Sequence, residues 1–260
     1  MSIDRAFLKE SFDAYVSRFD AQDERISLKI DHTYRVAENS DSISASLGLS
    51  SAEKDVAWAI AMLHDIGRFE QAAASHSFID SPSNDHAEAG VQFLFGAGQL
   101  CRFVPAGSCT EAELRCIELA IHYHNKHLLP EDLTPAQQLF CSIIRDADKL
   151  DIFRICLVNS FRTVHEYTRE EVASSPISPI VCECFAKHET LDYSKRQYPA
   201  DIFLGHIAMC FGLCFPCSRQ RAAEQGYLEQ MMDFSFTGEA EERAFAEMKR
   251  QTRLFLTSQT

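Results

Sequence analysis

The sequence is short of basic residues. It has 25 Lys and Arg against 38 Asp and Glu, which gives a formal net charge of −13 with His neutral. A protein that binds the phosphate backbone of DNA or RNA needs a concentrated surface of Lys and Arg. We therefore expect no nucleic-acid polymer among the partners of this chain, and any anion that it binds must be attracted by metal ions.

Long apolar runs are also missing. The longest weakly polar stretch, residues 202–217, contains His206 and Pro216 and is shorter than the ~20 residues that a membrane-spanning helix needs. Near the N-terminus Asp4 and Arg5 interrupt the apolar residues, which is not typical of a secretory signal. We therefore expect a soluble cytoplasmic protein with no membrane partner.

Segments that alternate between apolar and polar residues are few, and apolar residues recur at helical spacing instead. The pattern predicts an all-α fold. Residues 172–179 are rich in Ser and Pro and interrupt the helical pattern. We expect a helical core over residues 1–170 and a helical C-terminal extension over residues 171–260, packed on the core as one globular unit.

Ten cysteines are present, but they are scattered through helix-like segments, unlike the disulfide framework of a secreted protein. Cys210, Cys214 and Cys217 have the C-x3-C-x2-C spacing that can bind an iron–sulfur cluster. The same spacing would place the three thiols on one apolar face of a helix, where a thiol packs as a small hydrophobic group. We favour the packing role.

The stretch AWAIAMLHDIGRFEQ, residues 57–71, is the centre of the chain's organisation. Ser50, with a Glu three residues later, has the spacing of a capping box that starts a helix, and we expect the helix to end at Gly67. His64 and Asp65 lie near this end. A neutral His and an Asp can bind a divalent transition metal, although such a pair is by itself more often structural.

Other predicted helices carry a His or an Asp at inward or terminal positions. His32 falls on the apolar stripe of a helix expected over residues 25–47, and His86 falls in the first turn of a later helix. His124 is the inward histidine of IHYHNKH, and Asp148 follows an apolar stripe into the core. A buried imidazole or carboxylate needs a hydrogen-bond partner or a cation.

The residues around these candidates lead to further expectations. Gly90 lies inside a predicted helix, where Gly costs about 1 kcal/mol relative to Ala, so another segment should approach it closely. Residues 71–84 are rich in Ser and Ala, and we expect a loop there over the mouth of the site. Asp146 and Asp151 are expected to be solvated or paired with basic neighbours.

The ordered set of His and Asp residues resembles the motif of the HD-domain superfamily of metal-dependent phosphohydrolases, which is a His, then a His-Asp doublet, then a distal Asp. The matching stretches are HTYRV, LHDIGR and RDADKLD, and DHAEAG and HYHNK are similar to the added histidines of two-metal members. The resemblance covers roughly residues 25–155 and implies an HD-domain helical bundle with a helical C-terminal extension.

The resemblance also implies a binuclear metal site with two divalent transition metal ions per chain, chosen among Mn, Fe, Co, Ni and Zn. The first metal would be held by His32, His64, Asp65 and Asp148. The second would use Asp65 as a bridge, together with His86 and His124. Two cations about 3.5–4 Å apart can activate a water and hold the oxygens of a phosphate ester.

The implied activity is hydrolysis of a phosphate ester in a small anionic substrate, with a nucleotide as one candidate. Asp65, Arg68 and Lys149 are the catalytic candidates, and Arg68 and Lys149 would also bind substrate by neutralising phosphate oxygens. Related sequences often carry Lys at the position of Arg68, and solvated surface charges are the alternative role for both basic residues. The sequence has no Gly-rich phosphate loop and no Ser/His/Asp nucleophile, which suits direct attack by water.

Two other functions are compatible with the same residues. Some relatives with this two-metal set bind two irons and oxidise a C–H bond, and His and carboxylate ligands suit iron equally well. A nucleotide-binding regulator with weak or lost activity is the third possibility, although the presence of every implied ligand argues against it. The sequence leaves the phosphate ester, the metal and the oligomeric state open.

Overall fold

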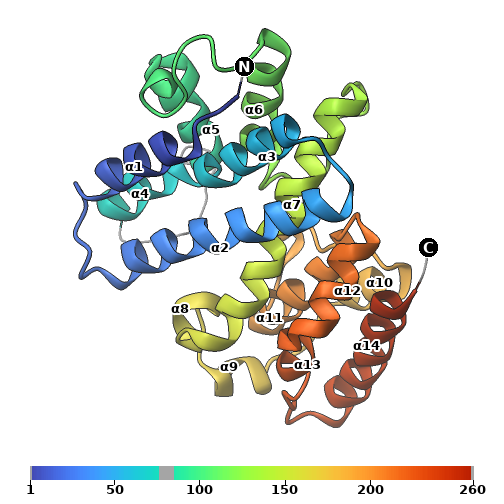
Figure 1. The fold of residues 1–260 in the computed structure, drawn as a ribbon. Helices are drawn as coiled ribbons and strands as arrows, with labels where there is room; N and C mark the ends of the chain where they lie inside the picture. Colours follow the sequence, from blue (N-terminus) through green and yellow to red (C-terminus); the bar gives the residue numbers. More distant parts are fainter. Residues whose placement is uncertain (1, 76–84, 259–260) are drawn as a thin grey trace. The chain divides into compact units, whose positions relative to one another are not determined.

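The structure is a computed structural model of the chain, and it describes residues 2–75 and 85–258. Every regular element in these ranges is a helix (Figure 1), which confirms the prediction of an all-α fold. The chain forms two compact units, Met1–Asp148 and Lys149–Thr260. The predicted boundary near residue 170, and the packing of the C-terminal extension on the core, stay predictions.

The first unit contains the helices that carry the candidate ligands. They are α1 (Arg5–Val16), α2 (Glu24–Ser46), α3 (Ser51–Leu63), α4 (Ile66–Ser75), α5 (His86–Val91), α6 (Glu111–Tyr123) and the first part of α7 (Pro135–Val158). Helix α3 packs against α1, α2 and α6, while α5 packs against α4 and α6 (Figure 1). The centre of this unit is therefore surrounded by the ends and faces of several helices.

Helix starts follow the capping residues of the sequence. The Ser50 side chain accepts a hydrogen bond from the Glu53 backbone, and the Ser50 backbone donates to the Glu53 carboxylate at 2.8 Å. Thr110 opens α6 with the same reciprocal pair. Such a pair satisfies two backbone groups that a helix start otherwise leaves unpaired. The capping box predicted at Ser50 is confirmed.

The predicted helix end at Gly67 is wrong. Helix α3 ends at Leu63 with His64 as its C-cap, and Gly67 lies in the first turn of α4. The expected loop over residues 71–84 is also wrong in part, because α4 continues to Ser75. Residues 76–84 lie outside the described residues.

An aromatic cluster attaches α1 to α4. Phe12 and Tyr15 of α1 make edge-to-face contacts with Phe69 of α4, at centroid distances of 5.8 and 6.1 Å, and Tyr15 also contacts Phe103 edge to face. These four side chains are buried, and each contributes about 1.5–3 kcal/mol through burial. The cluster fixes α4, the helix that follows the His-Asp doublet.

The second unit begins within α7 and is also helical. Its further α-helices are α8 (Phe161–His165), α9 (Arg169–Ala173), α10 (Pro179–Lys187), α11 (Pro199–Ala208), α12 (Pro216–Gln225), α13 (Tyr227–Met231) and α14 (Glu239–Thr257). Helix α11 packs against α8, α9 and α10, and α14 packs against α10 and α12. Among the described residues, no helix combines the length and the apolar character that crossing a membrane requires.

The predicted single helix face for Cys210, Cys214 and Cys217 is wrong. Helix α11 ends at Ala208, a 3-10 turn follows over Met209–Gly212, and α12 starts at Pro216. Cys210 is buried and Cys214 is exposed. The three thiols therefore do not share one helix face, because the chain turns between them.

Candidate metal centre

The His-Asp doublet sits at the end of α3 and is almost completely buried. His64 is 0% exposed and Asp65 is 3% exposed. The His64 Nδ1–H donates to the Ala61 carbonyl oxygen at 2.7 Å, which satisfies one of the carbonyls that a helix end leaves unpaired. Because a carbonyl can only accept, this bond fixes the tautomer and leaves the Nε2 lone pair directed into the site.

Helix α6 ends in the same way. His124 is its C-cap, and its Nδ1–H donates to the Ile121 carbonyl oxygen at 2.7 Å. The Nε2 atom of His124 is thus also presented as a lone pair. His122 is partly exposed and packs edge to face on Tyr123. The predicted burial of His124 is confirmed.

Helices α2 and α7 bring the first His and the last Asp of the motif together. His32 is completely buried, as predicted, and its Nε2 lies 3.1 Å from Asp148 Oδ1. The same carboxylate oxygen is 3.9 Å from His64 Nε2. About two turns after His32 on α2, the Asn39 side chain donates to the Ala147 carbonyl of α7 at 3.1 Å. This hydrogen bond fixes the two helices beside the site.

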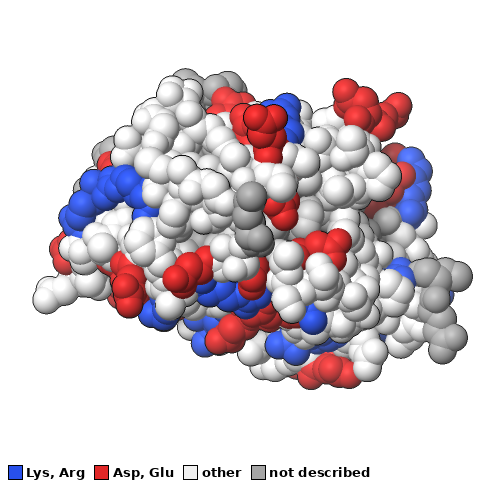
Figure 2. Space-filling model, turned by 45° about the horizontal axis from the view of Figure 1, so that its top comes forward, with Lys and Arg blue, Asp and Glu red and all other residues white. Residues whose placement is uncertain are grey.

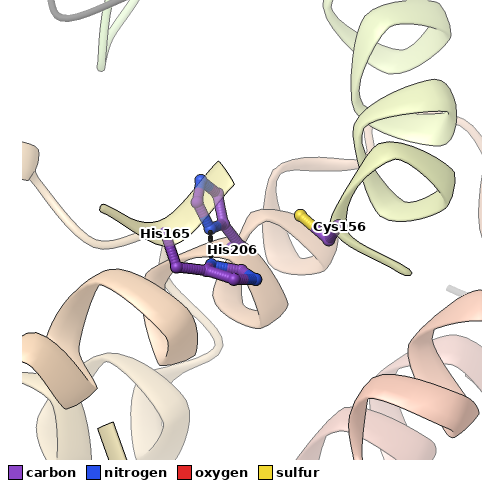
Figure 3. A group of neighbouring side chains, drawn as sticks. All are labelled: Cys156, His165 and His206. Atoms are coloured by element: carbon purple, nitrogen blue, oxygen red, sulfur yellow. Dashed lines mark hydrogen bonds between the residues drawn. The ribbon is translucent and has the colours of Figure 1, made fainter. Parts of the chain in front are cut away.

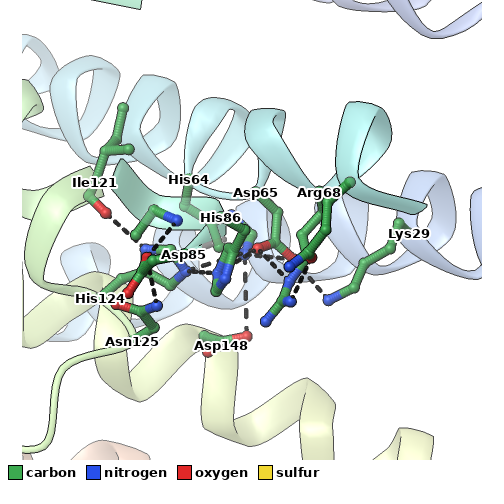
Figure 4. A network of polar contacts seen from close by, with 12 residues as sticks. Lys29, His64, Asp65, Arg68, Asp85, His86, Ile121, His124, Asn125 and Asp148 are labelled. Carbon is green, nitrogen blue, oxygen red and sulfur yellow. Dashed lines mark hydrogen bonds and ion pairs between the residues drawn. The ribbon is translucent and has the colours of Figure 1, made fainter. Parts of the chain in front are cut away.

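His86 reaches the site from the first turn of α5. Its Nε2 lies 2.9 Å from His124 Nε2 and 3.1 Å from Asp65 Oδ1. Asp85 caps α5 and accepts hydrogen bonds from Asn125 and Lys126. The residues that flank the two histidines therefore bond to each other and hold the two rings together (Figure 4).

The carboxylate of Asp65 lies between two pairs of histidines. Its Oδ2 atom is 3.6 Å from Nε2 of both His32 and His64. Its Oδ1 atom is 3.1 Å from Nε2 of His86 and 3.6 Å from Nε2 of His124. A carboxylate whose two oxygens face two different sets of nitrogen ligands has the arrangement of a bridging ligand.

Two glycines allow α5 to approach the doublet. A Cβ atom on Gly67 would lie 2.3 Å from the His86 carbonyl oxygen and 2.7 Å from the Gly90 nitrogen. A Cβ atom on Gly90 would lie 3.3 Å from the Ile66 side chain and 3.5 Å from the Gly67 nitrogen. The predicted close approach at Gly90 is confirmed, and its partner is the turn that follows Asp65.

The electrostatics of the site favour the protonation states that bind metal. Burial lowers the pKa of His64 to about 3, and burial also lowers the pKa of His124. Burial opposes ionisation of Asp65, but the charge of Lys29 and the nearby imidazoles hold the pKa of this carboxyl well below its usual range. The pKa of Asp148 is lowered against the effect of burial, mainly by His32. Neutral imidazoles and ionised carboxylates are the forms that coordinate a metal.

Basic side chains lie beside Asp65. Lys29 Nζ is 2.6 Å from Asp65 Oδ2, and Arg68 Nε is 3.8 Å from Asp65 Oδ1. Arg68 also donates to the Gln71 side chain at 2.7 Å. Lys149 begins the second unit, where its Cε would lie 3.1 Å from a Cβ on Gly212. The structure thus places Arg68 at the site, and the role of Lys149 stays a prediction.

Sequence reasoning missed several residues that shape the site. Lys29 lies three residues before His32 on α2, a spacing that places both on one side of the helix. Arg145 of α7 donates to the carbonyls of Tyr123, Lys126 and His127, so it fixes the chain on both sides of His124, and no local pattern indicates this. Asp146 and Asp151 are both buried, so the expectation that they are solvated is wrong, and the alternative that they pair with basic neighbours stays a prediction.

Comparison with known proteins agrees with this geometry. Residues 30–152 match the family model of the HD domain. These residues are an HD domain. The HD domain includes each of the six candidate ligands, from His32 to Asp148. No curated protein and no solved structure matches the chain.

HD domains bind divalent metals, and most of them are metal-dependent hydrolases. The residues present here fit such ions. The ligand atoms of His32, His64 and Asp148 lie within 4.8 Å of one another, as do those of His64, Asp65 and His124. The buried Nε2 atom of His64 has no hydrogen-bond partner among the described residues. A buried lone pair of this kind fits a metal ligand.

Proposed function

We propose that the protein is a metal-dependent phosphohydrolase that uses a metal-activated water to cleave a phosphate ester of a small anionic substrate. Nucleotides are among the candidate substrates. The observation that carries this proposal is the position of Asp65, whose two carboxylate oxygens face His32 and His64 on one side and His86 and His124 on the other. This arrangement suits a pair of ions better than a single ion.

The residues would divide into two sets of ligands. His32, His64, Asp65 and Asp148 would hold the first ion, and Asp65, His86 and His124 would hold the second. Such ions, among Mn, Fe, Co, Ni and Zn, lower the pKa of a bound water and withdraw charge from phosphate oxygens. The protein contributes the fixed directions of the imidazole lone pairs, which the carbonyls of Ala61 and Ile121 set for His64 and His124.

Cations beside the ligands support an anionic substrate. Lys29 and Arg68 lie on opposite oxygens of Asp65, and their side chains are 14% and 12% exposed. A partly exposed guanidinium or ammonium group can bind phosphate oxygens when metals neutralise the carboxylate. We therefore assign substrate binding to Arg68, add Lys29, and keep Lys149 as a further candidate.

Overall charge limits the size of the substrate. The chain carries a net charge of −13, and Figure 2 shows Lys and Arg interspersed with Asp and Glu on the visible face. Long polyanions meet a repulsive field, whereas a small phosphate ester can enter a locally positive site. A cytoplasmic location, where such esters are abundant, is part of this proposal.

The test is metal-dependent phosphate release by the full chain. Protein loaded with Mn, Fe, Co, Ni or Zn is screened against phosphomonoesters, nucleotides and cyclic dinucleotides. Asp65→Ala should abolish turnover and metal binding in the HD domain more completely than any single His→Ala change, because it removes a ligand from both ions of that domain. Asp132→Ala, at an exposed position, is the matched control and should behave as wild type.

The outcome also separates the alternatives. Equal phosphate release by wild type and Asp65→Ala would rule out the proposal. Oxygen consumption by an iron-loaded sample, without phosphate release, would favour the di-iron oxygenase. Nucleotide binding with no turnover under any metal would favour a regulatory role.

A further inference from the structure

A second group of metal-binding side chains lies in the unit formed by residues 149–260. Cys156 belongs to α7, His165 is the last residue of α8, and His206 belongs to α11. The ligand atoms of these three residues all lie within 4.8 Å of one another. In Figure 3 the sulfur of Cys156 points toward the two imidazole rings.

The packing of this unit holds the three side chains in place. Cys156 is 5% exposed and His165 is 0% exposed, whereas His206 is partly exposed. The His165 ring packs against Phe161 at a centroid distance of 4.3 Å and against Phe203 at 5.4 Å. A ring confined in this way presents its nitrogens in fixed directions.

The two imidazoles do not satisfy each other completely. Their Nδ1 atoms lie 2.9 Å apart, so one ring can donate to the other. The Nε2 atom of His165 is buried and has no hydrogen-bond partner among the described residues. Buried polar atoms of native proteins are rarely left in this state, and a bound cation is one way to satisfy such an atom.

The protonation states agree with a cation site. Burial lowers the pKa of His165 to about 4, and burial together with the nearby His165 and Arg196 lowers the pKa of His206 well below its ordinary value. Both rings are therefore neutral at physiological pH and keep a lone pair for a metal. Burial raises the pKa of the Cys156 thiol, so a metal must displace the thiol proton as it binds.

We propose that Cys156, His165 and His206 bind one transition metal ion of borderline softness, with Zn²⁺ as the best fit. One thiolate and two imidazoles are ligands that Zn²⁺ prefers, and three protein ligands leave a fourth position open. The partly exposed His206 places that position within reach of water or a small ligand. Binding releases the thiol proton to solvent and forms a bond from sulfur to the metal.

This site differs in chemistry from the HD-domain centre. The HD-domain candidates are imidazoles and carboxylates, whereas this group includes a sulfur atom. Ions that favour oxygen ligands, such as Mn²⁺, should select the HD domain, and Zn²⁺ or Co²⁺ should occupy both sites. The sulfur therefore gives a signal that separates the two.

The experiment uses the full chain loaded with Co²⁺ alone. A cobalt–thiolate bond gives a charge-transfer absorption in the near ultraviolet, which ligation by imidazole and carboxylate does not give. We expect this band in wild type and in Asp65→Ala. Cys156→Ser should lose the band and should bind about one Co²⁺ per chain fewer than wild type. Cys184→Ser is the matched control, since Cys184 is also buried but contacts the Thr190 carbonyl, and it should keep the band.

A second variant protects the test against misfolding. His206 is partly exposed, so His206→Ala should fold even where Cys156→Ser does not, and it should weaken Co²⁺ binding at this site at least tenfold. A band that persists in Cys156→Ser, or that disappears in Cys184→Ser instead, would overturn the proposal. So would a wild-type protein that binds Co²⁺ without any thiolate band.

Discussion

Two single residues, His64 and His124, are directed by the same local device. Each follows a helix as its C-cap and donates its Nδ1–H to the carbonyl three residues earlier, at 2.7 Å in both cases. The bond uses a carbonyl that the helix end leaves unpaired. The position of a His directly after a helix therefore explains its tautomer.

This device predicts different outcomes for two neighbouring histidines. In Mn²⁺-loaded protein, where only the HD-domain site should be occupied, His124→Ala should lower the metal content from about two ions to about one per chain, because a site with three protein ligands does not readily replace one with water. His122→Ala should leave the content near two, since His122 packs on Tyr123. Elemental analysis of the purified variants measures this, and the reverse pattern would contradict the assignment of His124.

Burial of His165 predicts an acid sensitivity of the metal-free protein. The folded pKa is about 4 against an ordinary value of 6.5, so below pH 6.5 the unfolded chain binds the proton more readily than the folded chain. The free energy of unfolding should fall as the pH drops from 6.5 towards 4, by up to about 3 kcal/mol. Above pH 6.5 this group should contribute no pH dependence.

Urea unfolding at several pH values, in the presence of a chelator, checks this expectation. His165→Asn should reduce the slope of unfolding free energy against pH between 6.5 and 4. His127→Asn, at an exposed position, should keep the wild-type slope. An identical slope in wild type and His165→Asn would show that other groups control the acid response.

The candidate ligands could be predicted from the sequence because each belongs to a recognisable local context. His32 and Asp148 follow apolar stripes, and His86 follows a capping Asp. Lys29 and Arg145 could not be identified in this way, because what they do depends on contacts with residues far along the chain. The burial of Asp146 could not be predicted for the same reason, since its surroundings come from other elements.

At the scale of helices, the predicted starts were reliable and one predicted end was not. Ser50 and Thr110 cap their helices through contacts that span only three residues. Gly67 suggested a helix end, but α4 begins at Ile66, almost directly after α3. What requires glycine at position 67 is the backbone of α5, and a contact between helices leaves no local signal.

Gly67→Ala should therefore disturb the site through α5. The new Cβ would lie 2.3 Å from the His86 carbonyl oxygen, a backbone atom that cannot rotate away. We expect a loss of about 1–3 kcal/mol in unfolding free energy and a fall in metal content, since His86 would move with the helix. Gly90→Ala is the matched control, and it should cost less because its closest contact is the Ile66 side chain at 3.3 Å.

Denaturant unfolding and elemental analysis of both glycine variants test this order. A Gly67→Ala protein with wild-type stability and metal content would show that α5 can shift without moving His86. Greater damage from Gly90→Ala than from Gly67→Ala would contradict the proposed contact.

At the scale of the whole molecule, the ligands of the HD domain are spread from His32 to Asp148, while the chain continues through a second helical unit. The resemblance in the sequence was sufficient to predict the domain because its motif residues occur in a fixed order. The Cys156, His165 and His206 group gave no such signal, since its members belong to three separate helices and match no motif spacing. Only the folded unit brings them together.

The net charge leads to a final prediction about the size of the ligand. The protein has a net charge of −13. At physiological salt the metal-loaded protein should therefore bind duplex DNA no more tightly than an unrelated acidic protein does, because few counterions would be released. Small phosphate compounds should bind, since the ions, Lys29 and Arg68 form a local positive region. Fluorescence anisotropy with labelled duplexes of increasing length measures DNA binding. Inhibition of phosphate-ester hydrolysis by inorganic phosphate measures the binding of a small phosphate compound. Tight binding that increases with duplex length would contradict the small-substrate assignment, whereas phosphate inhibition that Arg68→Ala weakens several-fold would support it.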